Sequence, residues 1–311
     1  MKYARLVMTL LILTSVISFY WLIPSTIKVS TFKVTRTHEL SVLRLINNHD
    51  LLFKSMSIYK DSADQKIKIK DVHFTVNNAL SNLIQIDIAT HKIQTKSFIS
   101  VNSINRDSAA IHWFFEIKTG WNPITRWNDY QEAKKIKKAT AQLLNEIKSF
   151  VEKPVNIYGF DIKEISLKDT LLIVTKFKCD KRPTNAQIYN AADELSKYLN
   201  QFNIKAINHP MVTILDNQTN DYTVMVGLSI DSKIPETEKF TLKKMPVNGK
   251  MFVTEVTGGT YAIQNGYSAL KNYLLDAKRP SPAVPFELLM NDRRQIIDST
   301  KWQTRLYFPV M

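Results

Sequence analysis

One carboxylate stands inside a segment whose other residues predict an apolar strand. The segment runs from Pro285 to Met290, and Glu287 lies between Phe286 and Leu288. Alternate side chains of a strand point to opposite faces, so we expect Phe286 and Leu288 to face helices and Glu287 to face a cleft. A carboxylate that leaves water is costly unless a partner compensates its charge. Glu287 is therefore a candidate partner for a cationic ligand.

Aromatic side chains could complete such a site, because the face of an aromatic ring attracts a cation. The candidates are Tyr222, Tyr261, Trp302 and Tyr307. Two alternatives stay open. Glu287 is either solvated or paired with a basic neighbour such as Arg305, and the aromatic residues are then ordinary core residues.

Other chemistry has little support in the sequence. The six histidines show no metal-ligand spacing, and no nucleophile elbow, Walker A or dinucleotide-binding motif occurs. Cys179 lies between Lys178 and Lys181 with no histidine near it in sequence, so we interpret it as a free thiol at a strand end. We therefore expect no metal, no cofactor and no catalytic residue other than, alternatively, Glu287.

The elements that would position Glu287 form an internal repeat. Strand, helix, strand and strand follow one another twice, first over 164–177, 184–202, 211–215 and 222–230, and then over 250–256, 262–277, 285–290 and 302–310. The two Pro-led strands align with each other, which places Val212 opposite Glu287 as its repeat-mate. Self-similarity of this kind indicates one duplicated unit, and we expect a pseudo-symmetric tandem β-α-β-β domain over residues 160–311.

This half of the chain resembles the GyrI-like family, which includes the effector-binding domains of AraC-type and multidrug-sensing MerR-type regulators. The residues that carry the resemblance are Gly259-Thr260-Tyr261, Phe286-Glu287, Asn291-Asp292 and Trp302–Val310. The resemblance implies a small-molecule ligand, often cationic or amphipathic, bound between the two halves. Glu287 holds the place of the family's ligand-binding glutamate, whereas Leu289 replaces the tyrosine that follows it. A few relatives are hydrolases, which implies as an alternative that Glu287 is a general base with a tyrosine as the acid.

The first half of the body predicts another α+β module, over residues 27–153. Strands are expected over 27–36, 67–76, 83–89, 92–104 and 109–118, with a short helix over 38–48 and a long amphipathic helix over 129–152. The strand with Trp113, the loop Gly120–Pro123 and the closing helix around Leu143 resemble the helix-grip fold of the START/polyketide-cyclase (SRPBCC) superfamily.

The N-terminus contains an apolar run from Leu6 to Ile23, which Pro24 ends. Eighteen helical residues rise about 27 Å, close to the ~30 Å of a bilayer core. A cleaved signal peptide is the rival interpretation, but a small-x-small cleavage site is poorly matched here. We expect residues 1–25 to be an uncleaved transmembrane signal anchor, with the membrane as a partner and the body on the exported side.

Composition limits the remaining possibilities. The chain has 311 residues and a net charge of +14, enough for two domains, and its single Cys cannot form an internal disulfide. The basic residues are spread out, and the densest cluster, Lys134 to Lys138, fits a solvated helix face. Since no nucleic-acid-binding motif occurs, we expect no nucleic-acid partner. The sequence predicts an anchored small-molecule-binding protein without a DNA-binding domain.

Overall fold

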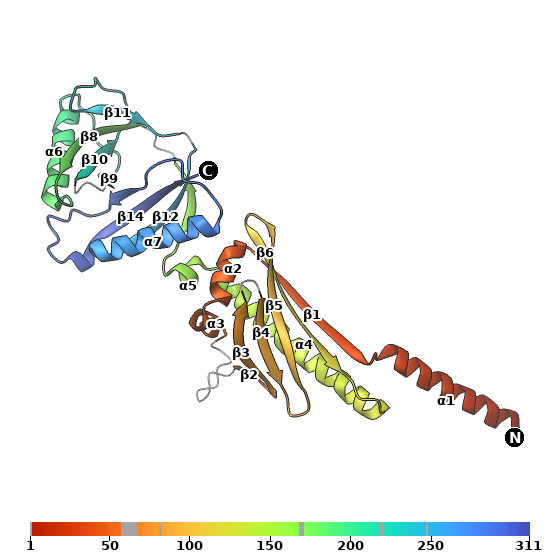
Figure 1. Ribbon diagram of the computed structural model, residues 1–311. Helices are drawn as coiled ribbons and strands as arrows, with labels where there is room; N and C mark the ends of the chain where they lie inside the picture. Colours follow the sequence, from red (N-terminus) through yellow and green to blue (C-terminus); the bar gives the residue numbers. More distant parts are fainter. Residues whose placement is uncertain (1, 57–66, 81–82, 168–170, 218–220, 247) are drawn as a thin grey trace. The chain divides into compact units, whose positions relative to one another are not determined.

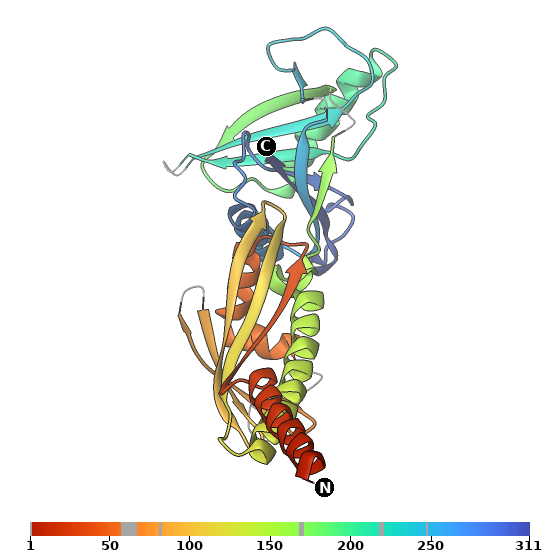
Figure 2. The same ribbon diagram turned by 90° about the vertical axis from the view of Figure 1, so that its right-hand side faces the viewer.

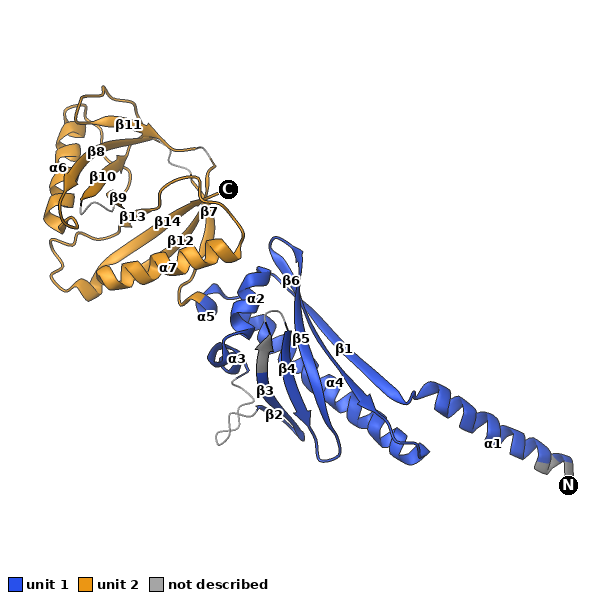
Figure 3. Cartoon of the chain, in the orientation of Figure 1, with its two compact units in different colours: residues 1–157 blue, residues 158–311 orange. Residues whose placement is uncertain are grey.

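The computed structural model describes residues 2–56, 67–80, 83–167, 171–217, 221–246 and 248–311. The chain divides into two compact units, residues 1–157 and residues 158–311 (Figures 1 and 3). Both units are mixtures of helices with one antiparallel sheet each.

The sheet of the first unit is six-stranded and antiparallel. Its strand order is β1 (Thr26–Thr35), β6 (Ser108–Lys118), β5 (Gln94–Asn105), β4 (Leu83–Ala89), β3 (Val72–Leu80) and β2 (Ile67–Ile69). Burial alternates along β4 and β6, as expected for strands with one face against a core.

Helix α4 (Pro123–Val151) covers that sheet and packs against β1 and β6, as both views show (Figures 1 and 2). It begins earlier than the predicted residue 129. The side chain of Asn122 caps its first turn by accepting from the backbone N–H of Ile124, and Pro123 occupies the first turn, where a missing N–H costs nothing. The shorter helices are α2 (Glu39–Ile46), α3 (His49–Ser55) and α5 (Pro154–Tyr158).

Trp113 is the largest fully buried side chain in the core of the first unit, with an exposed fraction of 0%. Its indole Nε1 donates to Ser97 Oγ at 2.9 Å, and Ser97 Oγ donates to the carbonyl of Ile86 at 2.6 Å. The ring of Phe74 packs edge-on at 5.7 Å. The polar atom of the largest buried side chain is thus satisfied inside the core.

Helix α1 (Lys2–Leu22) corrects the N-terminal prediction. Among the residues that the structure describes, no helix is both long enough and apolar enough to cross a membrane. The helix ends one residue before the predicted run does, and Ile23 is buried. Tyr20 Oη donates to the carbonyl of Trp121 at 2.8 Å, which ties the last turn to the rest of the unit. The finding that no described helix could cross a membrane contradicts the predicted transmembrane anchor, the membrane partner and the single-pass location with an exported body.

The second unit contains one eight-stranded antiparallel sheet. Its strand order is β11 (Thr241–Lys244), β8 (Leu171–Cys179), β10 (Tyr222–Ser229), β9 (Met211–Asp216), β13 (Phe286–Leu289), β14 (Gln303–Val310), β12 (Lys250–Thr257) and β7 (Lys163–Ser166). The sequence β-α-β-β occurs twice, with α6 (Asn185–Asn200) in the first repeat and α7 (Thr260–Asp276) in the second. The strand order is symmetric about its centre, as the predicted duplication requires. The single strand predicted over 164–177 is wrong, because the structure has two strands there: β7 pairs with β12 at one edge of the sheet, and β8 lies near the other edge.

The two repeats meet at a short seam between β9 and β13. Two residue pairs define their register, Glu287 with Val212 and Leu288 with Met211. The backbone N–H of Leu289 also donates to the carbonyl of Pro210 at 3.0 Å.

Both long helices of this unit cover the same face of the sheet. Helix α6 packs on β8 and β10 with a core that includes Val212, and α7 packs on β12 and β14 with a core that includes Leu306. Glu287 pairs with Val212 on one side and with Leu306 on the other. It therefore lies on the helix face, and not on the opposite face where the alternation pattern was expected to place it.

Candidate functional site

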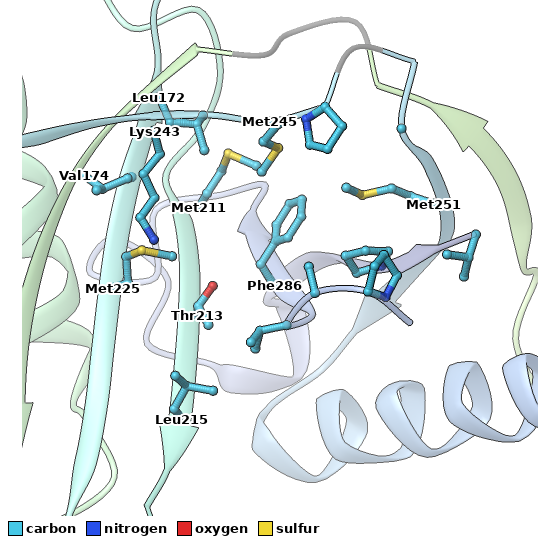
Figure 4. A pocket seen from close by; sticks show the side chains of 18 of the residues that line it. Leu172, Val174, Met211, Thr213, Leu215, Met225, Lys243, Met245, Met251 and Phe286 are labelled. Atoms are coloured by element: carbon cyan, nitrogen blue, oxygen red, sulfur yellow. The ribbon is translucent and has the colours of Figure 1, made fainter. Parts of the chain in front are cut away.

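A cavity of about 720 Å³ lies on the face of the second unit's sheet that the helices leave free (Figure 4). Its described lining is mostly apolar and comes from strands of both repeats, among them Val174, Met211, Met225, Met251 and Phe286. Five of the lining residues are methionines, namely Met211, Met225, Met245, Met251 and Met311. We call this space the methionine cavity.

Strand register explains why these side chains meet. Val174 of β8 pairs with Gly227 of β10, and Gly227 pairs with Met211 of β9. Gly227 carries no side chain, and a Cβ there would lie 3.0 Å from Val174 Cγ1. The floor of the methionine cavity is therefore open at its centre, between Val174 and Met211.

The next row of the sheet places Met225 between two polar neighbours. Met225 pairs with Lys176 on β8 and with Thr213 on β9. Methionine has three rotatable bonds and a polarizable sulfur, so its side chain adapts to the shape of a bound group. Thioethers on several strands give the methionine cavity a soft, adjustable wall.

All the ionisable side chains in the described lining are lysines: Lys176, Lys243 and Lys250. Lys250 Nζ lies 2.8 Å from Glu164 Oε1 and is thereby neutralised. Partial burial lowers the pKa of Lys243, and the neighbouring charge of Lys176 lowers it further. The electrostatic character of the methionine cavity is therefore positive.

Glu287 lies outside the methionine cavity and is almost fully buried, at 4% exposure. Its Oε2 lies 3.6 Å from Arg293 Nη2. Burial raises the pKa of this carboxyl group, while the charges of Arg293 and Arg182 oppose the shift. Burial also raises the pKa of the nearby Tyr267 phenol, and the carboxylate of Glu287 adds to that shift.

The four predicted aromatic residues do not gather around Glu287. Arg293 contacts both Glu287 and Trp302: one guanidinium nitrogen lies near the carboxylate, and the guanidinium lies over the indole at 5.0 Å. Tyr307 stacks on Phe286 on the helix-free face, with ring centroids 4.7 Å apart. Tyr222 packs against the core under α6, and Tyr261 is 78% exposed. None of these four residues lines the methionine cavity among its described residues.

Arg305, the expected alternative partner of Glu287, pairs with Glu255 instead, at 2.6 Å. The basic partner that Glu287 does have is Arg293, in the turn region after β13. Within the described ranges, no three His, Cys, Asp or Glu side chains are grouped as metal ligands would be.

Sequence reasoning missed the lining residues Met225, Lys176 and Lys243. The signal available was the alternation along residues 171–178, where Leu172, Val174 and Lys176 share a face. The sequence does not state which face the helices cover, so the pattern alone does not assign these residues to a cavity.

No family model matches the chain, and no curated protein matches it. Among solved structures, EcmrR in its complex with DNA is similar with 13% identity and a TM-score of 0.43, covering 59% of this chain and 70% of that one. The isolated C-terminal domain of EcmrR is similar with 12% identity and a TM-score of 0.39, covering 49% of this chain and 98% of that one.

A START superfamily protein from Mycobacterium smegmatis is similar with 10% identity and a TM-score of 0.26, covering 39% of this chain and 98% of that one. At these identities and TM-scores, the likenesses assign no ligand, activity or residue role to this chain.

Proposed function

We propose that the second unit binds an amphipathic small molecule whose apolar part occupies the methionine cavity. The observation that carries this proposal is the cavity of about 720 Å³ on the helix-free face. This volume falls within the range of ~300–1,000 Å³ of small-molecule sites, which combine an apolar lining with a few polar groups.

The lining supports an apolar occupant. Met225 and Met211 are only half-buried, so their side chains keep contact with the space that a ligand would fill. Burying apolar surface contributes roughly 25 cal/mol per Å². An alkyl or aromatic group in the methionine cavity therefore gains free energy at little cost in polar desolvation.

The cationic ligand expected from the sequence finds no carboxylate in this lining. Glu287 faces the helices, and the described lining contains no Asp or Glu side chain. Our proposal therefore keeps the amphipathic character of the expected ligand and drops its positive charge.

The experiment is a titration of the full chain, labelled with ¹³C at its methionine methyl groups, with decan-1-ol. We expect the methyl signals of Met211, Met225 and Met251 to shift together. Met56, buried in the core of the first unit, and Met8, on the exposed surface of α1, serve as internal references. A shift at Met8 alone would mean that decan-1-ol coats α1 and would overturn the proposal.

Two tryptophan variants sharpen the titration. Met225→Trp fills the methionine cavity and should abolish the shifts of the remaining cavity methionines. Leu275→Trp adds the same bulk at a 56% exposed position of α7 and should leave them unchanged. Equal titrations of the two variants would also reject the proposal.

A further inference from the structure

Two lysines at the methionine cavity have no acidic partner among the described residues. Lys176 and Lys243 both line the cavity; among the described residues Lys250 is the cavity lysine that forms an ion pair, and these two form none. Lys244, the neighbour of Lys243 on β11, does not line it. The two side chains therefore place positive charge on the cavity, and no acidic side chain among the described residues pairs with it.

The two lysines lie on the neighbouring strands β11 and β8, with their side chains on the same face of the sheet. Lys243 is in register with Leu172, four residues before Lys176 on β8. At ~3.3 Å per residue the two backbones are about 13 Å apart along the strand. Figure 4 shows the Lys243 side chain extending along the sheet toward Met225, the residue that pairs with Lys176.

The electrostatics agree with this arrangement. The charge of Lys176 acts on Lys243 and lowers its pKa, in addition to the larger effect of partial burial. Two like charges that approach beside an apolar surface repel each other. An anion between them would remove that repulsion and would accept hydrogen bonds from both ammonium groups.

We propose that Lys176 and Lys243 bind the anionic head group of an amphiphile whose chain lies in the methionine cavity. This inference rests on the proposed function and adds the sign of the head group. The chemistry required is a carboxylate or phosphate oxygen attached to an unbranched apolar chain. A cationic amphiphile with the same chain is disfavoured by both lysines.

The test compares four probes with the full chain: decanoate, decyl phosphate, decan-1-ol and decyltrimethylammonium. Each is titrated below its micelle concentration, with the Met225 methyl signal reporting on the methionine cavity and the Met8 signal on α1. We expect the two anions to bind about tenfold or more tightly than decan-1-ol, which corresponds to ~1.4 kcal/mol. The cation should bind more weakly than the alcohol. Raising the salt concentration should narrow these differences, because the ammonium groups are exposed and screened.

Variants then locate the effect. In Lys176→Gln/Lys243→Gln, decanoate should lose about tenfold in affinity while decan-1-ol keeps its own. The matched control, Lys205→Gln/Lys244→Gln, changes the net charge equally and should bind decanoate as the wild type does. Lys176→Glu/Lys243→Glu should prefer decyltrimethylammonium over decanoate.

The outcomes separate the two proposals. If no probe moves the cavity methionines, the proposed function fails. If decan-1-ol binds there but the anions show no advantage, or if the control lowers decanoate affinity as much as the double variant does, only the head-group assignment is overturned. Inorganic phosphate alone, titrated without a chain, should leave Met225 unshifted. A decyl phosphate response without a decanoate response would restrict the site to phosphate.

Discussion

Glu287 Oε2 lies 3.6 Å from Arg293 Nη2, and the two side chains are only 5% and 6% exposed. The same nitrogen of Arg293 donates to Thr304 Oγ1 at 2.7 Å, and the guanidinium lies over the ring of Trp302. The protein therefore supplies its own cation to the carboxylate that the sequence offered to a ligand. Among described atoms Arg293 Nε has no hydrogen-bond partner, so the guanidinium is only partly satisfied.

The first prediction concerns the pH dependence of Glu287→Gln. Burial raises the pKa of Glu287 above the ordinary value of 4.5, so the folded state holds the proton more tightly than the unfolded chain does. Its stabilising contribution is complete below pH 4.5 and is lost as the pH rises through the raised pKa. The melting temperature of the variant, relative to the wild type, should therefore increase from pH 4.5 toward pH 8.

A variant that becomes relatively less stable over that pH range would show that Arg293 outweighs burial. The same variant tests the hydrolase alternative, which stays a prediction. If the full chain hydrolyses an ester or amide probe and the variant does not, Glu287 acts as a base. Equal rates in both proteins would remove it from any such chemistry.

The second prediction concerns the packing of α7 on the sheet. A Cβ at Gly266 would lie 2.7 Å from both Leu306 Cδ1 and Val256 Cγ2. Alanine improves helix propensity by up to about 1 kcal/mol, but forcing a methyl group into a packed core costs ~1–3 kcal/mol. We expect Gly266→Ala to lower the free energy of unfolding in urea by about 1 kcal/mol. Ser268→Ala, at an exposed position of the same helix, should not lower it.

The third prediction concerns the buried hydrogen bonds of Trp113 in the first unit. Ser97→Ala removes the acceptor of the indole N–H and leaves that donor buried and unsatisfied. This change should cost about 1–3 kcal/mol of unfolding free energy. In a Trp113→Phe background the donor is absent, so the same serine substitution should cost markedly less. Equal costs in the two backgrounds would contradict the structural role of this bond.

The repeat in the second unit was predictable because the sequence patterns that reveal it lie within short segments of the chain. Each copy carries its own strand alternation and its own helix periodicity, and Thr184 and Gln187 even form the capping box that such a helix start predicts. The start of α4 was misplaced because Asn122 and Pro123 were interpreted as part of a turn, whereas they form the N-cap and first turn of the helix.

The site was harder to predict. Alternation along a strand divides its residues into two sets on opposite faces, but it does not show which set the helices cover. Phe286 and Leu288 are as apolar as a helix-facing pair should be, yet they lie on the helix-free face. Which set faces the helices depends on the neighbouring strands, through pairs such as Glu287 with Leu306. One residue of offset moves every side chain to the other side. The cavity lysines were missed for the same reason, because a lysine such as Lys176 is common at positions of a strand that face solvent.

The seam between the repeats has a consequence for the methionine cavity. Two residue pairs hold β9 to β13, whereas six join β9 to β10 and four join β13 to β14. Together with the hydrogen bond from Leu289 N–H to the carbonyl of Pro210, these two pairs form the sparsest strand pairing at the centre of the sheet. Residues that line the methionine cavity come from strands on both sides of this seam. The second unit thus consists of two repeats that are joined through one short strand pairing. A group bound in the methionine cavity would therefore contact strands of both repeats across the most sparsely paired line of the sheet.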